Sequence, residues 1–143
     1  MTTLMLDDEF VSLWHHPEQN VVHHKIKAFL LPGRFEKLLS AGAELMEKHG
    51  AVKWLSDDRD NVVVSPEDIK WADDVWFPRV KAAGFRYWAV VVPSLTVGAV
   101  QLKGLQTRRR EQGVTVELFE TVEAAMAWLA RVGTEQGASG VRP

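Results

Sequence analysis

One segment, Ala51 to Pro93, constrains the fold of this chain more than any other. It begins with an apolar run, continues through an acidic loop and a well-capped helical pattern, and ends in a second apolar run. Two strands joined by a helix in this order form the βαβ unit of a right-handed parallel crossover. The segment therefore predicts an α/β protein that contains a parallel sheet.

A β-hairpin is predicted before this segment. Phe10 to His15 and Val21 to Phe29 are strand-like runs, and the turn formers Pro17 to Asn20 separate them. If Glu18 and Gln19 form the tip, alternation divides the side chains between two faces. One face then carries Val11, Leu13, His15, Val22, His24 and Ile26, and the other carries Trp14, His16, His23, Lys25 and Lys27. We expect the first face to be core and the second to be wet.

Four helical regions are expected after the hairpin. They are Phe35 to His49, Ser65 to Ala83, Ser94 to Gln112 and Thr121 to Val132. Ser65 and Thr121 are predicted N-caps, and the Ser65 hydroxyl should accept a hydrogen bond from an amide near Glu67 or Asp68. Pro78 lacks an amide donor, so the second region is expected to break or kink before Arg79 to Ala83 and to form two short helices. Arg108 to Arg110 are expected in a solvated last turn.

Three further strands are predicted between these helices, at Ala51 to Leu55, Phe85 to Val92 and Val114 to Phe119. Phe85 to Val92 is almost continuously apolar, which is typical of a central strand buried on both faces. The sequence thus predicts a mixed sheet of about five strands, with a hairpin followed by parallel crossovers, and about four to five helices. Residues 1–132 should form one domain, and the glycine-rich residues 133–143 a disordered tail.

The composition excludes several classes of protein. With 143 residues, 46% hydrophobic residues and a net charge of -2, the chain is typical of a single globular domain and not of a dedicated nucleic-acid binder. It has no cysteine, so disulfides and thiolate chemistry are excluded. No apolar run approaches the length of a transmembrane helix, and residues 1–10 do not resemble a signal peptide. A cytoplasmic, bacterial-type protein is expected.

The order of elements, together with three sequence segments, resembles the STAS-like domains of bacterial anti-sigma-factor antagonists. The segments are KWLSDDRDNVVVSPED, DDVWFPRVKAAGFRYWAVVVP and VELFETVEAAMAWL. The closer likeness is to stand-alone STAS-like proteins without an assigned role. In signalling members of the family, a phosphorylatable Ser or Thr in an Asp-Ser-Ser-Gly context begins the helix after the third strand. The matching position here is Ser65, which Pro66 follows.

A candidate ligand or regulatory site follows the third predicted strand, because open α/β sheets usually bind ligands beyond the carboxyl ends of their strands. Carboxylates gathered in one loop could hold Mg²⁺ or serve a phosphoryl reaction. A solvated turn in which one acid caps backbone amides explains the same residues without a metal. The candidate site consists of Ser56, Asp57, Asp58, Arg59, Asp60, Ser65 and Ser94.

Two histidine pairs lie near one end of the predicted hairpin. His15 and His24, or His16 and His23, could approach one another across the two strands. A zinc site would need further ligands, for which the sequence offers only Glu18 nearby and His49 at an unknown distance. We therefore expect no metal, no cofactor and no catalytic residue, and we expect histidines that bond to backbone or water.

Six tryptophans are many for a chain of this length. Most should be core, but Trp14 and Trp71 fall on faces that the pattern makes polar, so they are the predicted interface residues. The sequence favours a non-catalytic regulatory or protein-interaction module that binds a protein partner or forms a homodimer. One alternative is a binding protein for a small apolar or lipid-like ligand, and another is an enzyme that uses the loop Asp57 to Asp60.

Overall fold

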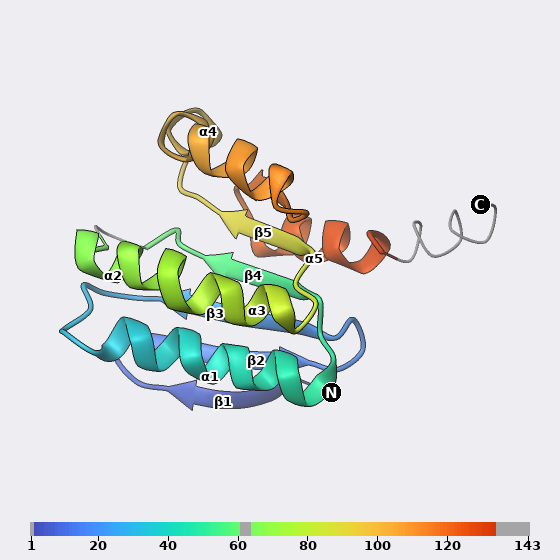
Figure 1. Cartoon of the computed structure of the whole chain (residues 1–143), viewed down its shortest axis with the longest axis horizontal. Helices are drawn as coiled ribbons and strands as arrows, with labels where there is room; N and C mark the ends of the chain where they lie inside the picture. Colours follow the sequence, from blue (N-terminus) through green and yellow to red (C-terminus); the bar gives the residue numbers. More distant parts are fainter. Residues whose placement is uncertain (1, 61–63, 134–143) are drawn as a thin grey trace.

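The computed structural model describes residues 2–60 and 64–133 as an α/β fold with one six-stranded sheet (Figure 1). The strands lie in the order in which they occur along the chain, antiparallel from β1 to β3 and parallel from β3 to β6. They are β1 (Thr3–Asp7), β2 (Val11–His16), β3 (Val21–Ile26), β4 (Lys53–Asp57), β5 (Tyr87–Val91) and β6 (Thr115–Phe119).

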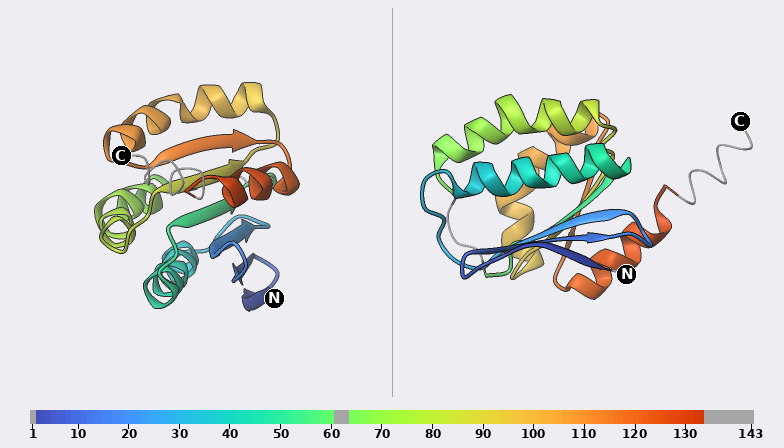
Figure 2. Two further views of the ribbon diagram at one scale, coloured as in Figure 1. Left: turned by 90° about the vertical axis from the view of Figure 1, so that its right-hand side faces the viewer. Right: turned by 90° about the horizontal axis from the view of Figure 1, so that it is seen from below.

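The helices form two layers on this sheet (Figure 2). One face carries α1 (Arg34–His49) and a helical run made of α2 (Pro66–Trp71), the π-helical turn η1 (Ala72–Trp76) and α3 (Phe77–Ala82). The opposite face carries α5 (Val122–Arg131), which packs on β4, β5 and β6. The remaining helix, α4 (Leu95–Glu111), packs along β6 at one edge of the sheet. No helix among the described residues is long and apolar enough to cross a membrane.

The hairpin register is confirmed. Leu13 pairs with His24 and His15 pairs with Val22, as a tip at Glu18 and Gln19 requires. The prediction that the second face is wet was wrong for His23, whose residue surface is only 7% exposed. Its neighbour Val21, on the same face, belongs to the buried cluster that also contains Leu55 of β4 and Leu129 of α5, so this face is partly buried as far as β3.

The strand count was predicted one too low, because Thr3–Asp7 forms an additional edge strand, β1. Its register with β2 shifts between Leu4 and Leu6, so that Leu4 pairs with Trp14 and Leu6 with Leu13. Asp7 fastens the strand by accepting hydrogen bonds from Ser12 Oγ (2.6 Å) and Lys27 Nζ (2.9 Å). Five residues with a shifted alternation give little sequence signal, since these long-range contacts determine the strand.

Two short α-helices are present, as predicted, but the chain does not break at Pro78. Residues 66–82 instead follow one helical path in which a π-helical turn separates two α-helical parts. Wider π-type hydrogen bonding accommodates the missing amide of a proline near the start of α3 without ending the helix. The helices at 34–49, 95–111 and 122–131 agree with the predicted regions. Of the tail predicted to be disordered, residues 134–143 lie outside the described residues.

An aromatic cluster forms the centre of the larger core. The rings of Trp54, Trp76, Phe85 and Trp88 meet edge to face, with centroids 5.0 Å apart for Trp54 and Trp76. Gly42 of α1 makes room for the Trp54 indole, because a Cβ at this position would overlap Cη2 and lie 2.8 Å from Cζ3. The tryptophans therefore fill the space between the sheet and its first helical layer.

Candidate functional site

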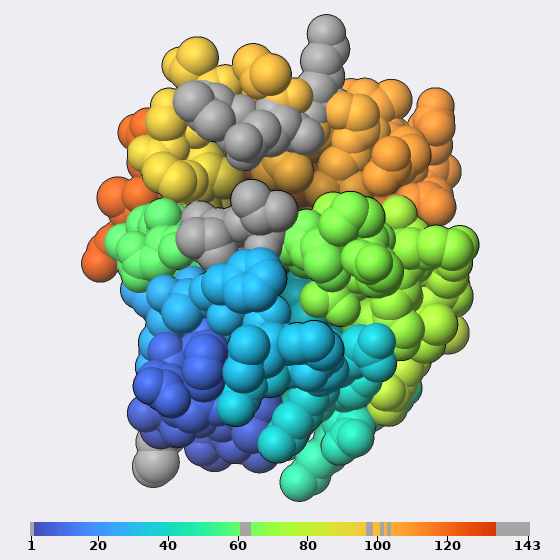
Figure 3. All heavy atoms as spheres, turned by 90° about the vertical axis from the view of Figure 1, so that its left-hand side faces the viewer, coloured from blue at the N-terminus to red at the C-terminus, as the bar shows by residue number. Residues whose placement is uncertain are grey.

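The candidate site lies at the carboxyl end of the parallel strands, which Figure 3 shows face on. This end brings together the end of β4, the start of α2 and the start of α4. Ser56 and Asp57 were predicted to lie just past the strand but are its last two residues, and both are buried. Because side chains alternate along a strand, the two point to opposite faces of the sheet.

Asp57 is engaged by charged neighbours. Only 2% of it is exposed, and its carboxylate accepts two hydrogen bonds from the Arg59 side chain, from Nε at 2.9 Å and from Nη2 at 2.8 Å. Lys25 Nζ lies 3.9 Å from the same carboxylate and 3.1 Å from Asp60. Burial alone would raise the pKa of Asp57, but the hydrogen bonds and charge of Arg59 outweigh it and hold the pKa below its usual value.

His24 and Asp58 meet on the other face. Trp54 Nε1 donates to His24 Nδ1 at 3.0 Å. Since an indole nitrogen only donates, Nδ1 must be unprotonated and a neutral His24 carries its proton on Nε2. That nitrogen lies 3.4 Å from Asp58 Oδ1. Both ring nitrogens of His24 therefore face groups of the protein itself.

The serines of the candidate site lie at structural positions of the fold. Ser56 Oγ is buried and accepts a hydrogen bond from Trp88 Nε1 at 2.8 Å. Ser65 is the N-cap of α2, as predicted, and its hydroxyl accepts a hydrogen bond from the Asp68 amide at 3.1 Å. Ser94 immediately precedes α4, whose first amide, that of Leu95, donates to Glu120 at 3.1 Å.

The histidines of the hairpin form two separate groups. His16 Nε2 and His23 Nδ1 are 2.9 Å apart, while His15 bonds to Asn20 and stacks on His49. Burial, with smaller contributions from His16 and His24, lowers the pKa of His23 to about 3. No three His, Cys, Asp or Glu side chains within residues 2–60 and 64–133 lie close enough together to hold a metal ion.

The predicted interface tryptophans are half-buried. Trp14 lies against His23, with ring centroids 4.5 Å apart, and Trp71 meets Phe35 edge to face. Trp14 lies on the predicted face of the hairpin, because it pairs with His23 of β3, and it pairs with Leu4 of β1 on its other side. The sequence did not foresee Leu4 as its neighbour.

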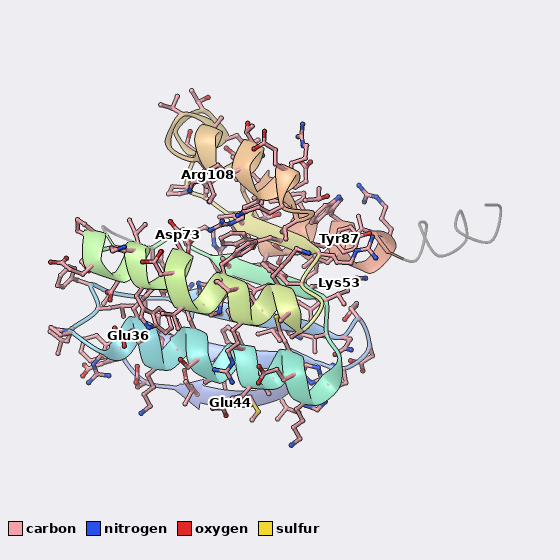
Figure 4. The ribbon with its side chains drawn as sticks, viewed as in Figure 1. Glu36, Glu44, Lys53, Asp73, Tyr87 and Arg108 are labelled. Atoms are coloured by element: carbon pink, nitrogen blue, oxygen red, sulfur yellow. The ribbon has the colours of Figure 1, made fainter. Side chains whose placement is uncertain are left out.

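Arg109 was expected in a solvated turn, but it is buried between α4 and the helical run. Its guanidinium lies 3.9 Å from the centre of the Phe77 ring, and Nη2 donates to Asp73 at 2.7 Å. Figure 4 shows Asp73 on the side of the run that faces α4. Arg109 therefore fastens two helices together, and its charge is not displayed for a partner.

Exposed apolar side chains are the feature of this end that sequence reasoning missed. Phe29 and Leu31 follow β3, Ile69 lies in α2 after β4, and Leu95 begins α4 after β5. Each leaves the sheet from a different place along the sequence, so only the parallel topology gathers them at one end. Exposed Asp60 and Glu67 lie on the same connections. We call these six residues the carboxyl-end surface.

Comparisons with known proteins give no further guide to the site. No protein-family model, curated protein or solved structure matches this chain.

Proposed function

We propose that this chain is a non-catalytic protein-interaction module of the STAS-like type, and that its partner protein docks on the carboxyl-end surface. The observation that carries the proposal is that four exposed apolar residues lie on the connections that follow parallel strands: Phe29, Leu31, Ile69 and Leu95. Apolar groups exposed together and bordered by charged residues are characteristic of protein interaction sites.

The state of the polar groups also favours docking over chemistry. A general base or nucleophile needs an atom that can reach a substrate. At this site, Arg59 occupies the Asp57 carboxylate, and both ring nitrogens of His24 face Trp54 and Asp58. These contacts give the loop Asp57 to Asp60 a structural role, since they fix its conformation between the apolar side chains.

The order of the elements supports the STAS-like part of the proposal. After β1 comes a hairpin, then three crossovers that each place a helix between parallel strands. This is the order on which the resemblance rests, with one additional strand at the edge. Ser65, the position that matches the regulatory residue of signalling members, borders the carboxyl-end surface at the start of α2.

Site-specific photo-crosslinking in cells that produce the protein naturally tests the proposal. A photoreactive side chain is introduced at Phe29 or Ile69, and at Glu44 as a control, because Glu44 is exposed on α1 away from this end (Figure 4). We expect the same partner protein to be linked from positions 29 and 69 and not from position 44. Equal linking from all three positions, or none from 29 and 69, would contradict the proposal.

A further inference from the structure

The two edges of the sheet differ in how their backbone groups are covered. At the β6 edge, α4 packs along the strand and Gln106 Nε2 donates to the Val116 carbonyl at 3.1 Å. At the other edge, β2 is the only described strand that pairs with β1. The outward backbone groups of Thr3–Asp7 form no other backbone hydrogen bond among the described residues. One edge is therefore closed by a helix, and the other is bare.

Bare edge strands usually carry features that prevent pairing with another chain, such as a lysine, a proline or an inward charge. Thr3–Asp7 contains neither lysine nor proline. Its only charged side chain, Asp7, is already bonded to Ser12 of β2 and to Lys27, which follows β3. The register shift at Met5 is the one feature of this strand that opposes pairing with another chain. Leu4 is 52% exposed and Met5 is 45% exposed.

We propose that β1 is a homodimerisation strand, which pairs antiparallel with β1 of a second copy and joins the two sheets into one. A row of free amide and carbonyl groups is satisfied best by another strand, which an ordinary apolar ligand does not supply. Two identical strands related by a twofold axis near Met5 form a closed, self-complementary contact. This dimer is independent of the partner proposed for the carboxyl-end surface.

The charges of the strand agree with pairing to itself. With the axis near Met5, the two Asp7 side chains lie at opposite ends of the contact, separated by about 14 Å, four residues at roughly 3.4 Å each. The apolar residues 4–6 of the two copies then meet in the centre. Trp14, which pairs with Leu4 on the neighbouring strand, borders the contact on the face away from α1. The sequence-based choice of Trp14 as an interface residue fits this arrangement.

Sedimentation of the full chain tests the proposal. We expect wild type to be dimeric at roughly 100 μM, and Met5→Lys to weaken dimerisation by about tenfold or more, since a buried lysine would disrupt the centre of the contact. Met5 has no cross-strand partner in β2, so the variant should keep its fold. Val100→Lys is the matched control, because Val100 is also exposed and apolar but lies on α4. It should leave the dimer unchanged.

Hydrogen exchange provides a readout that needs no variant. The amides of Thr3–Asp7 in wild type should exchange more slowly as the protein concentration rises, while those of β6 should not change. A monomeric wild type, a Met5→Lys variant that dimerises as well as wild type, or a dimer without concentration-dependent protection in Thr3–Asp7 would each overturn the proposal.

Discussion

The two faces of the sheet bury polar side chains by different means, and His23 and His24 show the difference within two consecutive residues. His24 lies on the face beneath α1, where it accepts a hydrogen bond from the Trp54 indole. His23 lies on the face that α5 partly covers. There it bonds to His16, and the charges of Asp57 and Arg59 act on its pKa in opposite directions. At these two neighbouring positions, His24 is bonded to a neutral indole donor, whereas His23 is surrounded by ionisable groups.

The difference has a consequence for stability. Indole donors do not titrate. The stability of the face beneath α1, which we call the aromatic face, therefore depends on how well its rings pack, and substitutions that change side-chain volume should lower it most. Ion pairs and buried imidazoles respond to pH, because the folded and unfolded states then bind protons differently. The two faces should therefore be separable by the kind of change that destabilises each.

The largest effect is expected on the aromatic face, from Gly42→Ala. The added methyl group would overlap the Trp54 ring, which has Trp76 and Phe85 around it and little room to move. We expect a loss of about 3 kcal/mol in the free energy of unfolding. Urea denaturation measures it.

Gly104→Ala is the control for this prediction, because a Cβ at this helical position would meet nothing within 4 Å. It should raise stability by roughly 0.5 to 1 kcal/mol, through the lower entropy of the unfolded chain. If both alanine variants changed stability by the same amount, the packing of Trp54 against α1 would not be the cause.

On the face that α5 partly covers, acid should lower the free energy of unfolding through His23. Its pKa is lowered to about 3 in the folded state, so between pH 6.5 and 3 the unfolded state binds a proton that the folded state does not. Stability is therefore lost as the pH falls through this window, by about 2 kcal/mol at pH 5. His23→Phe keeps a ring beside Trp14 and removes the titration. Urea denaturation from pH 7 to 5 should give a flatter dependence for this variant, and equal slopes would refute the assignment.

Asp57→Asn should cost about 1 to 2 kcal/mol at pH 7, because it removes the charge that Arg59 binds; the 38% exposure of Arg59 keeps the loss moderate. The lowered pKa of Asp57 means that this contribution is present at pH values above the unfolded pKa and is lost as the pH falls through the folded pKa. Its window lies below about pH 4. Asp57 therefore affects stability at lower pH than His23 does over most of its range.

Thermal unfolding at pH 7 and pH 3 tests the Asp57 prediction. The difference between wild type and Asp57→Asn should shrink at pH 3. Asp74→Asn is the control, because Asp74 pairs with Lys70 on the exposed side of the helical run and its loss should leave stability nearly unchanged. A cost for Asp57→Asn no larger than that of the control would show that burial does not strengthen the pair.

The parts of the fold that were predictable rest on local signals. The turn formers Pro17 to Asn20 set the hairpin register, and Ser65 and Thr121 mark helix starts through hydrogen bonds that close within three residues. Each of these features is determined by residues within a few positions of one another, so the sequence alone is enough to predict it.

The parts that were missed depend on residues far apart in sequence. β1 exists through its pairing with β2, and Arg109 is buried because Asp73 and Phe77 come from another helix. The same holds for the candidate site. Its location at the end of β4 was predicted from the order of the elements, but its pairing of Asp57 with Arg59 and its border of exposed apolar residues appear only in the folded chain.

The smallest effects are expected at the helix N-caps, of which each face of the sheet has one. Ser65 caps α2 on one face and Thr121 caps α5 on the other, each accepting a hydrogen bond of 3.1 Å from an amide three residues on. Ser65→Ala and Thr121→Ala should each cost about 0.5 to 2 kcal/mol, as measured by urea denaturation. Ser65→Asp should be nearly neutral, since aspartate caps equally well. A cost for Ser65→Asp as large as that for Ser65→Ala would mean that repulsion from Glu67 and Asp68 outweighs the cap, and a phosphate on Ser65 would then weaken the start of α2 as well.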